Sequence, residues 1–193
     1  LELGGSEKEV CVLFADIRGF TALSEKMEAS KVVYVLNNYF QSMIDVIFKH
    51  NGTLDKIIGD ELMVLYGVPL KTDNDPQNAV NSAIEMLFSL ENFNKKMESE
   101  GLPKLEIGIG INFGNVVSGN IGSDQQMNYT VIGDNVNLAA RLCSNAKPGE
   151  IIISNSVYNF LDDKSKFIKS VPLSVKGKSK PIDNWLYNHK NFN

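Results

Sequence analysis

The 193-residue sequence is poor in cysteine, histidine, tryptophan and long apolar runs. Its two cysteines, Cys11 and Cys143, each fall in an apolar pattern, so we expect buried reduced thiols and a reducing compartment instead of a disulfide framework. No apolar run approaches the ~20 residues that span a membrane, and no signal peptide is recognisable. These absences favour a cytoplasmic domain that makes no membrane contact itself, whether or not a larger protein attaches it to a membrane.

An excess of basic residues is also lacking. The chain carries 19 Lys and Arg against 23 Asp and Glu, a net charge of -4, which argues against a nucleic-acid-binding surface. A small anionic ligand would therefore need metal ions or a few placed cations. With 43% hydrophobic residues, the length suits one globular domain. We expect residues 10–193 to form it and residues 1–9 to be a linker or the cut end of a longer chain.

Two acids stand where predicted strands end. Residues 10–16 are apolar up to Asp16, which is the pattern of a strand buried on both faces. Residues 54–58 and 62–66 form a predicted hairpin with Asp60 at its tip. If the first strand lies beside this hairpin, the two carboxylates meet at one edge of a sheet, as two-metal phosphoryl chemistry requires. Each acid alone is explained as well by a place in a turn.

The turn after Asp16 is a candidate phosphate site. Residues 18–20 bring the chain to Thr21, which we expect to cap a short helix. Backbone N–H groups, including those of Phe20 and Thr21, would then face outward beside Asp16. An acid next to such a turn suggests that metal and phosphate bind together, although the same acid can simply close a strand-to-helix turn.

Residues 128–141 read as a short strand, a Gly-Asp corner capped by Asp134 and the start of a helix. Asn137 and Arg141 lie four residues apart, so an amide and a guanidinium leave the same side of this helix, beside its buried stripe. A polar ligand fits there, although two solvated groups on an exposed face are the simpler explanation of the spacing alone.

Two lysines are unusual for their surroundings. Lys56 lies in an otherwise buried strand and is expected to point away from Asp55 and Ile57, where an amine reaches solvent unless it meets a ligand. Lys176 begins a loop with three lysines, residues 176–180, which is the one cationic cluster of the sequence. Such a loop is usually just solvated, and the alternative is an anion contact.

Periodicity and turn residues predict the remaining elements. They are helices over 30–51, 75–101 and 154–161 and strands over 105–112, 116–121, 127–131, 150–154, 167–175 and 182–187. Gly108 and Gly110 leave one face of their strand nearly free of side chains, so a ligand or another chain is expected to come close. Helices are expected to cover one face of a largely antiparallel sheet, an α+β fold with a ferredoxin-like βαββαβ core and additional strands and helices.

Four segments resemble the motifs of class III adenylyl cyclase catalytic domains. They are Phe-Ala-Asp-Ile-Arg-Gly-Phe-Thr (14–21), Asp-Lys-Ile-Ile-Gly-Asp (55–60), Tyr-Thr-Val-Ile-Gly-Asp-Asn-Val-Asn through Arg141 (129–141) and Val-Lys-Gly-Lys (175–178). Four motifs in this order and spacing are highly specific, whereas any one would be weak. The resemblance extends from about Val10 to Tyr187 and implies the class III nucleotidyl cyclase fold.

The resemblance also implies an activity, that of an adenylyl cyclase, a phosphorus-oxygen lyase that converts ATP to 3',5'-cyclic AMP and pyrophosphate in signal transduction. Asp16 and Asp60 match the acids that bind two Mg²⁺ or Mn²⁺ ions per site, with the carbonyl of Ile17 assisting. Lys56 and Thr130 match the pair that selects adenine, because a donor and an acceptor fit its N1 and 6-amino group.

The same resemblance assigns contacts to the ribose and the phosphates. Asn137 matches the residue that orients the ribose, Arg141 the one that neutralises charge in the transition state, and Lys176 a triphosphate contact. In this family these residues and the acids come from different subunits, so a homodimer with two interface sites is implied. A covalently linked regulatory domain outside this chain is also expected.

One departure and three alternatives accompany this interpretation. Relatives with Thr at the purine position commonly carry an Arg shortly before it, where this chain has Gln125 and Gln126, so a phosphate contact is missing and the turnover rate is open.

A guanylyl cyclase would carry an acceptor in place of Lys56. A diguanylate cyclase shares the core fold but lacks the motif of residues 135–141. A catalytically weak module that only dimerises and relays signals usually loses the acids or the Asn and Arg, all of which are present.

Overall fold

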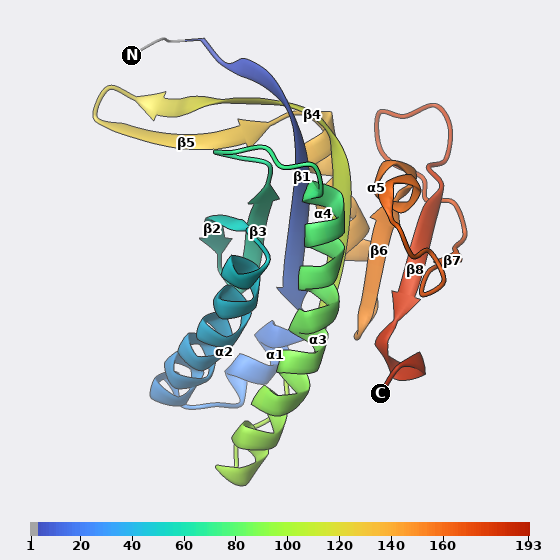
Figure 1. Ribbon diagram of the computed structural model, residues 1–193. Coiled ribbons are helices and arrows are strands. Elements are labelled where there is room, and N and C mark those ends of the chain that lie inside the picture. Colours follow the sequence, from blue (N-terminus) through green and yellow to red (C-terminus); the bar gives the residue numbers. More distant parts are fainter. Residues whose placement is uncertain (1–3) are drawn as a thin grey trace.

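An eight-stranded sheet forms the centre of the computed structural model, which describes residues 4–193 (Figure 1). Its strands are β1 (Ser6–Ile17), β2 (Thr53–Ile58), β3 (Glu61–Tyr66), β4 (Ile107–Ser123), β5 (Gln126–Ile132), β6 (Glu150–Ser154), β7 (Ile168–Lys169) and β8 (Asn184–Asn188). They follow the order β2-β3-β1-β4-β6-β8-β7, with β5 paired to β4. The pairing of β4 with β6 is parallel and the other pairings of the described strands are antiparallel.

The helices are α1 (Phe20–Glu25), α2 (Ala29–Lys49), α3 (Asp75–Ser99), α4 (Asp134–Asn145) and α5 (Asn155–Phe160), with a 3-10 turn, η1, at His189–Asn191. The chain order β1-α2-β2-β3-α3-β4, together with the sheet order β2-β3-β1-β4, is the ferredoxin-like βαββαβ core that the sequence predicts. The other helices and strands are additions to that core.

Helices cover both faces of the sheet, so the prediction of one covered face is wrong. On one face α2 and α3 lie side by side (Figure 1), over a core that includes Cys11 and Leu13 of β1. On the other face α4 packs over Val10 and Val12 of the same strand. The apolar residues of β1 are buried on both of its sides, and such a strand requires cover on both.

Helix α4 lies directly on the backbone of β4. A Cβ at Gly110 would lie 2.1 Å from the backbone N of Cys143, and one at Gly108 would lie 2.9 Å from the carbonyl O of Ala146. These glycines therefore admit a helix of the same chain, and not the ligand or second chain that the sequence suggested.

Strand β4 is one 17-residue strand, where the sequence predicted two shorter ones. Its second half pairs with β5, and residues 117–132 form an arm, called here the β4–β5 arm, that projects beyond the rest of the sheet (Figure 1). Strand β1 already begins at Ser6, because residues 6–9 pair with residues 115–118 of β4. The first residues of the expected linker, 1–3, lie outside the described residues.

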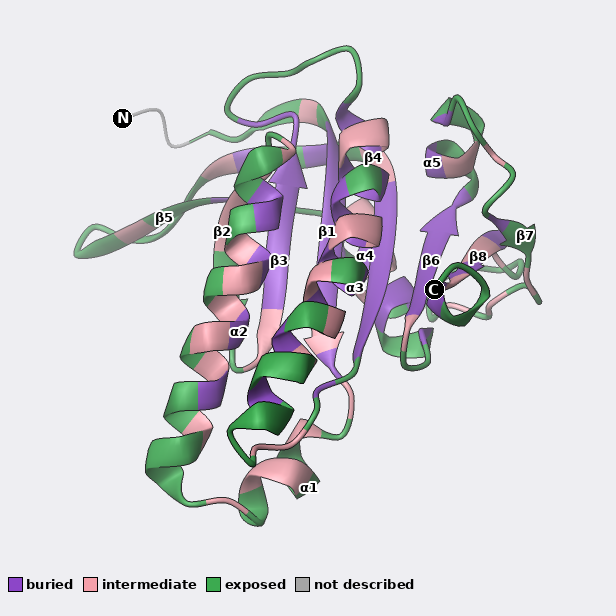
Figure 2. Cartoon of the chain, turned by 60° about the horizontal axis from the view of Figure 1, so that its bottom comes forward, coloured by how far each residue is buried: buried purple, intermediate pink, exposed green. Residues whose placement is uncertain are grey.

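Burial separates the middle of the sheet from its edge. Strand β1 from Val10 onward, β3 and the first half of β4 are mostly buried, whereas β2 and the arm are largely exposed (Figure 2). Cys11 and Cys143 are free and buried, as predicted, and burial raises the pKa of Cys143 to about 12. Within residues 4–193, the helices are too short or too polar to cross a bilayer.

Helices α1, α2 and α4 begin within two residues of their predicted starts. The observed N-caps of α1 and α4 are Gly19 and Gly133, in place of Thr21 and Asp134, and Glu28 caps the helix that was expected over residues 30–51. None of the three observed caps makes a side-chain hydrogen bond. Cap preference was therefore the wrong signal here, because the packing of the helices on the sheet determines where they begin.

Candidate active site

The two predicted metal acids meet at one edge of the sheet. Strands β1 and β3 pair antiparallel with Ala15 opposite Leu62, which places Asp16 next to Asp60 at the tip of the β2–β3 hairpin. The backbone N–H of Ile17 donates a hydrogen bond of 3.1 Å to Oδ2 of Asp60. The structure therefore confirms the convergence of the two carboxylates that the sequence predicts.

The electrostatics of this edge show an excess of negative charge. Burial raises the pKa of Asp16 to about 7, helped by a hydrogen bond with Asp60 and by the charges of Asp60 and Glu61. Arg18, whose guanidinium nitrogen lies 3.8 Å from Oδ2 of Asp16, acts in the opposite direction. Burial and the charge of Asp60 also raise the pKa of Glu61. A divalent cation at this edge would relieve the repulsion.

The donor set fits Mg²⁺ or Mn²⁺ bound together with a phosphate ligand. Groups of three or more His, Cys, Asp or Glu side chains arranged as a metal site are absent from the described part of the chain. Mg²⁺, however, commonly takes one or two carboxylates and completes its shell with water and substrate phosphates. Two acids and the carbonyl at Ile17 match that pattern better than they match an all-protein cage.

Arg18 is a functional candidate that the sequence reasoning read only as part of a turn. Its guanidinium donates to the carbonyl O of Ala146 at 3.2 Å and lies near Sγ of Cys143, both in or just after α4. The same side chain faces Asp16. Arg18 thus connects the end of β1 to the C-terminal end of α4. No local sequence pattern predicts this contact, because Ala146 and Cys143 lie more than 120 residues from Arg18 along the chain.

The turn after β1 has the geometry expected of an anion-binding turn. Gly19 has φ +69°, in the left-handed region that favours glycine, and it is the residue before α1. The first helical hydrogen bond runs from the N–H of Leu23 to the carbonyl of Gly19. The N–H groups of Phe20 and Thr21 precede it and so are left over by the helix, as predicted.

Lys56 and Thr130 come together through a third residue, Asp55. Oγ1 of Thr130 donates a 2.9 Å hydrogen bond to Oδ2 of Asp55, and Nζ of Lys56 lies 3.4 Å from the same oxygen. The two residues expected to read the base are therefore neighbours, although 74 positions separate them in the chain. Asp55 was not among the predicted site residues.

A β-bulge explains why the sequence reasoning missed this cluster. The pairing of β2 with β3 shifts between Leu54 and Lys56, so Asp55 is the extra residue on its strand. A bulge interrupts the alternation of side chains, and Asp55 and Lys56 form an ion pair instead of pointing to opposite faces as predicted. The available signal was an acid in the middle of a strand that is otherwise mostly apolar.

The predicted ribose and phosphate residues line one hollow. Asn137 and Arg141 are both exposed on α4, one turn apart, and Lys176 lies in the loop before β8. A hollow of about 510 Å³ is lined by Asn137, Ala140, Arg141, Ser144, Val175 and Lys176. The structure thus brings these three polar groups to one place, with two cations facing a small-residue surface.

The acids and the hollow are not joined within one chain. Across residues 4–193, neither a hydrogen bond nor an ion pair links Asp16 or Asp60 to Asn137, Arg141 or Lys176. Gln125 and Gln126 lie at the exposed tip of the β4–β5 arm, Gln125 in the turn and Gln126 as the first residue of β5. One chain therefore presents separate groups of site residues and not a closed cleft.

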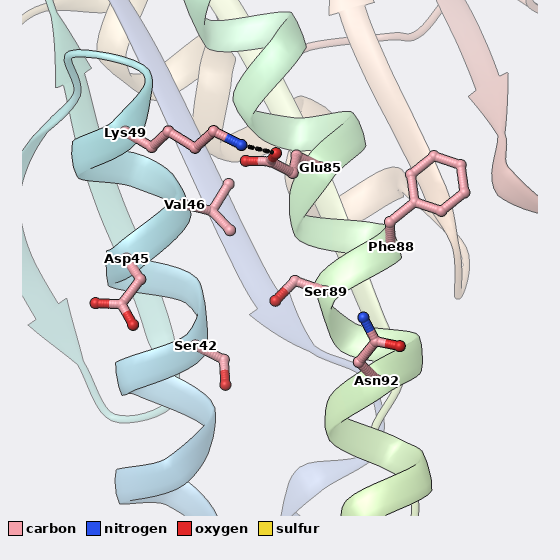
Figure 3. Close-up of a pocket in the computed structure, with 8 residues that line it drawn as sticks. All are labelled: Ser42, Asp45, Val46, Lys49, Glu85, Phe88, Ser89 and Asn92. Carbon is pink, nitrogen blue, oxygen red and sulfur yellow. Dashed lines mark hydrogen bonds and ion pairs between the residues drawn. The ribbon is translucent and has the colours of Figure 1, made fainter.

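A further polar groove lies between α2 and α3, on the face away from α4. It is lined by Ser42, Asp45, Val46, Lys49, Glu85, Phe88, Ser89 and Asn92. Lys49 and Glu85 form an ion pair across it (Figure 3). None of the predicted site residues lines this groove, so it is not part of the candidate active site.

Comparisons with known proteins identify the family of the chain. Residues 5–188 match the model of the adenylate and guanylate cyclase catalytic domain. An adenylate cyclase of Anabaena cylindrica is 36% identical over 188 residues, which cover 93% of this chain and 36% of that protein. The chain spans about a third of the length of the curated relatives it matches.

Two solved structures are similar over almost the whole chain. The adenylyl cyclase CyaB from P. aeruginosa has a TM-score of 0.92 and 39% identity, covering 96% of each chain. The guanylyl cyclase Cya2 has a TM-score of 0.90 and 38% identity, covering 96% of this chain and 94% of that one. On these matches, the chain belongs to the family of class III adenylate and guanylate cyclase catalytic domains.

Proposed function

We propose that this domain is an adenylyl cyclase that converts ATP to 3',5'-cyclic AMP and pyrophosphate. Overall similarity does not decide between the purines, because one adenylyl and one guanylyl cyclase match almost equally well. The observation that carries the proposal is the cluster of Lys56 and Thr130 around Asp55. An ammonium group donates to N1 of adenine, an acceptor there, whereas N1 of guanine is itself a donor. Guanine would require an acceptor in place of Lys56.

The metal edge supports the chemistry of the proposed reaction. Asp16, Asp60 and the carbonyl of Ile17 would hold two Mg²⁺ or Mn²⁺ ions, which when bound favour ionisation of the ribose 3'-hydroxyl and offset the triphosphate charge. The leftover N–H groups of Phe20 and Thr21 would donate hydrogen bonds to phosphate oxygens beside these acids. Attack of the 3'-oxygen on the α-phosphorus forms the cyclic ester and releases pyrophosphate.

The hollow on α4 supplies the other half of the proposed site. Asn137 orients the ribose by hydrogen bonding, and Arg141 stabilises the negative charge that develops on the α-phosphate oxygens. Lys176 contacts the triphosphate as a point charge. These roles fit the exposure of all three side chains and the two cations in one hollow.

We infer that two copies of the chain form the working enzyme. The separation of the acids from the hollow supports this inference, because a symmetric dimer brings the acids of one chain to the hollow of its partner. A second support is a set of large apolar side chains exposed on β2 and the β4–β5 arm: Ile57, Ile58, Val117, Ile121, Tyr129 and Ile132. An exposed apolar surface of this kind marks an association site.

The remaining proposals concern the whole protein. Relatives about three times longer support regulation by a covalently linked domain and a place in signal transduction. The ATP requirement and the free buried thiols of Cys11 and Cys143 support a cytoplasmic location.

Product identification tests the proposed function. The purified domain is incubated with ATP or with GTP, in Mg²⁺ or Mn²⁺, and the nucleotide products are separated and identified. We expect cyclic AMP from ATP and little cyclic GMP, with loss of product in Asp60→Asn as the control for contaminating activity. Preferred formation of cyclic GMP would make the domain a guanylyl cyclase, and no product with either nucleotide would favour the non-catalytic module.

A further inference from the structure

We propose that Asp55 is a positioning residue that makes Thr130 selective for adenine. This inference rests on the proposed adenylyl cyclase function and extends it to a residue outside the predicted pair. Asp55 acts by accepting a hydrogen bond from the hydroxyl of Thr130, which leaves only the oxygen lone pairs of that hydroxyl to face the base.

A threonine hydroxyl alone does not distinguish the two purines. It carries one proton to donate and two lone pairs to accept with, and it rotates freely to present either. The 6-amino group of adenine needs an acceptor, whereas O6 of guanine needs a donor. An unrestrained Thr130 would therefore satisfy both bases equally well.

The hydrogen bond to Asp55 removes this ambiguity. Oγ1 of Thr130 lies 2.9 Å from Oδ2 of Asp55, and an ionised carboxylate accepts but does not donate. The single proton of Thr130 is thus committed to Asp55, so that only its lone pairs remain for the base. A guanine O6 placed there would face an acceptor, and such a mismatch is a strong means of rejection.

Burial stabilises the hydrogen bond between Thr130 and Asp55, so that Thr130 can discriminate between the two purines. The side chain of Asp55 is only 4% exposed, and Thr130 is 6% exposed. Water therefore competes poorly for the hydrogen bond, and a Thr130 hydroxyl that turned away would leave a buried carboxylate oxygen with one donor fewer. The extra residue in the bulge of β2 is what places this acid under Thr130.

Lys56 contacts the same acid and still has protons free to donate to the base. Its Nζ lies 3.4 Å from Oδ2 of Asp55, yet its side chain is 43% exposed. An ammonium group has three protons, so it can face Asp55 and still donate to N1 of adenine. Asp55 thus orders one donor and one acceptor side by side, which is the pattern of the adenine edge.

The alternative is that Asp55 only ties the β4–β5 arm to β2. A tie of that kind would affect both substrates together, because a displaced arm damages the site for ATP and GTP alike. The ratio of kcat/KM for ATP to kcat/KM for GTP separates the two roles, since it changes only if Asp55 acts on base recognition.

The test measures this ratio in Asp55→Leu, which removes the acceptor but keeps a side chain of similar shape. We expect the ratio to fall by about 10-fold or more, comparable to the loss of one selective hydrogen bond. Thr130→Ser, which keeps the hydroxyl, is the matched control and should retain the ratio to within about threefold. Asp55→Asn should lower the ratio by no more than Asp55→Leu, because its amide NH2 can donate to Oγ1 of Thr130 and leave the hydroxyl proton free for O6 of guanine.

A double-mutant cycle with Thr130→Val identifies the route of the effect. Once Thr130 has no hydroxyl, adding Asp55→Leu should change the ratio no further, because Asp55 acts through that hydroxyl. A further fall in the double mutant would mean that Asp55 acts through Lys56, and an unchanged ratio in Asp55→Leu would mean a structural tie. Either result would overturn the proposal.

Two controls keep the result interpretable. If Asp55→Leu does not fold by circular dichroism, Asp55→Ala removes the same acceptor with a smaller side chain and takes its place. The unmutated domain is measured first, because a lack of preference for ATP would refute the proposed function itself. A ratio that does not fall in the acceptor-free variants would refute only the role of Asp55.

Discussion

The backbone N–H of Ile17 donates a 3.1 Å hydrogen bond to Oδ2 of Asp60, so the end of β1 holds the acid at the tip of the β2–β3 hairpin. The backbone of Ile17, whose carbonyl is a proposed metal ligand, therefore fixes the side chain of Asp60, which is another. The strands that carry them are joined by backbone pairing and not by these side chains. Either acid can thus be changed to an amide of the same size without removing the pairing of β1 and β3.

The first prediction concerns these acids. Asp16→Asn or Asp60→Asn keeps the size of the side chain but removes anionic oxygens that hold a divalent cation, so the rate of product formation should fall at least ~10²-fold. Initial rates with saturating ATP and metal measure the effect, with circular dichroism as the folding control. A folded Asp60→Asn protein with a near-normal rate would contradict the two-metal assignment.

The second prediction follows from the raised pKa of Asp16. Its pKa of about 7 lies above the ordinary 3.8, so the metal-free folded state binds more protons than the unfolded state between these values. The free energy of unfolding contributed by Asp16 therefore decreases as pH rises from about 4 to about 7. In EDTA, Asp16→Asn should raise the Tm relative to the unmutated protein at pH 8 and much less at pH 4.

Metal addition should reverse this difference. Mg²⁺ or Mn²⁺ binds the folded state and should raise the Tm of the unmutated protein, but not that of Asp16→Asn, because the variant lacks an anionic ligand. The pair of thermal scans, with and without EDTA at pH 8, checks both signs. A Tm for Asp16→Asn below that of the unmutated protein in EDTA would show that burial and the neighbouring acids do not make ionised Asp16 unfavourable in the folded state.

The third prediction concerns the choice of base. Lys56→Glu combined with Thr130→Cys should abolish the preference for ATP, because a carboxylate accepts from N1–H of guanine but leaves N1 of adenine facing another acceptor. The ratio of kcat/KM values for ATP and GTP measures the change. A double variant that keeps its preference for ATP would mean that other residues read the base.

How far the sequence predicted this site depends on how local each signal is. Asp16 and Asp60 were placed correctly because a strand end and a Gly-Asp hairpin tip are short patterns with fixed geometry. Asn137 and Arg141 were predicted on one side of a helix by their spacing, and the helix is there. Nothing local, however, revealed that Lys176 would share a hollow with them.

The errors arose where a long-range contact overrides a local pattern. A bulge at Asp55 broke the alternation on which its orientation was predicted. Gly110 looked like open space, and only the tertiary structure shows that α4 fills it. The second face of the sheet was wrongly predicted to be uncovered for the same reason, because α4 packs on it.

The fourth prediction tests the shared site. Asp16→Ala and Arg141→Ala should each be nearly inactive, since every site of a symmetric dimer then carries the change. In a mixed dimer, one site collects both changes while the other takes its acids from one chain and its Arg141 from the partner. Random exchange at equal amounts makes about half of the dimers mixed, so activity should recover to roughly a quarter of the unmutated value.

Chain exchange is confirmed separately, by co-purification of two differently tagged chains. If exchange occurs and no activity returns, each chain builds its own site or the dimer is not the catalytic form. Recovery well above a quarter would mean that the mixed dimer forms in preference to the two parent dimers.

The absence of side chains between α4 and β4 at Gly108 and Gly110 has a mechanical consequence. With Cys143 and Ala146 against the strand backbone, and Arg18 joining the same helix to the end of β1, the acids and Arg141 of one chain belong to a single stiff unit. Their spacing within a chain is therefore fixed. In the proposed dimer, the distance between one chain's acids and the partner's Arg141 would change only by rotation or sliding of one rigid subunit against the other.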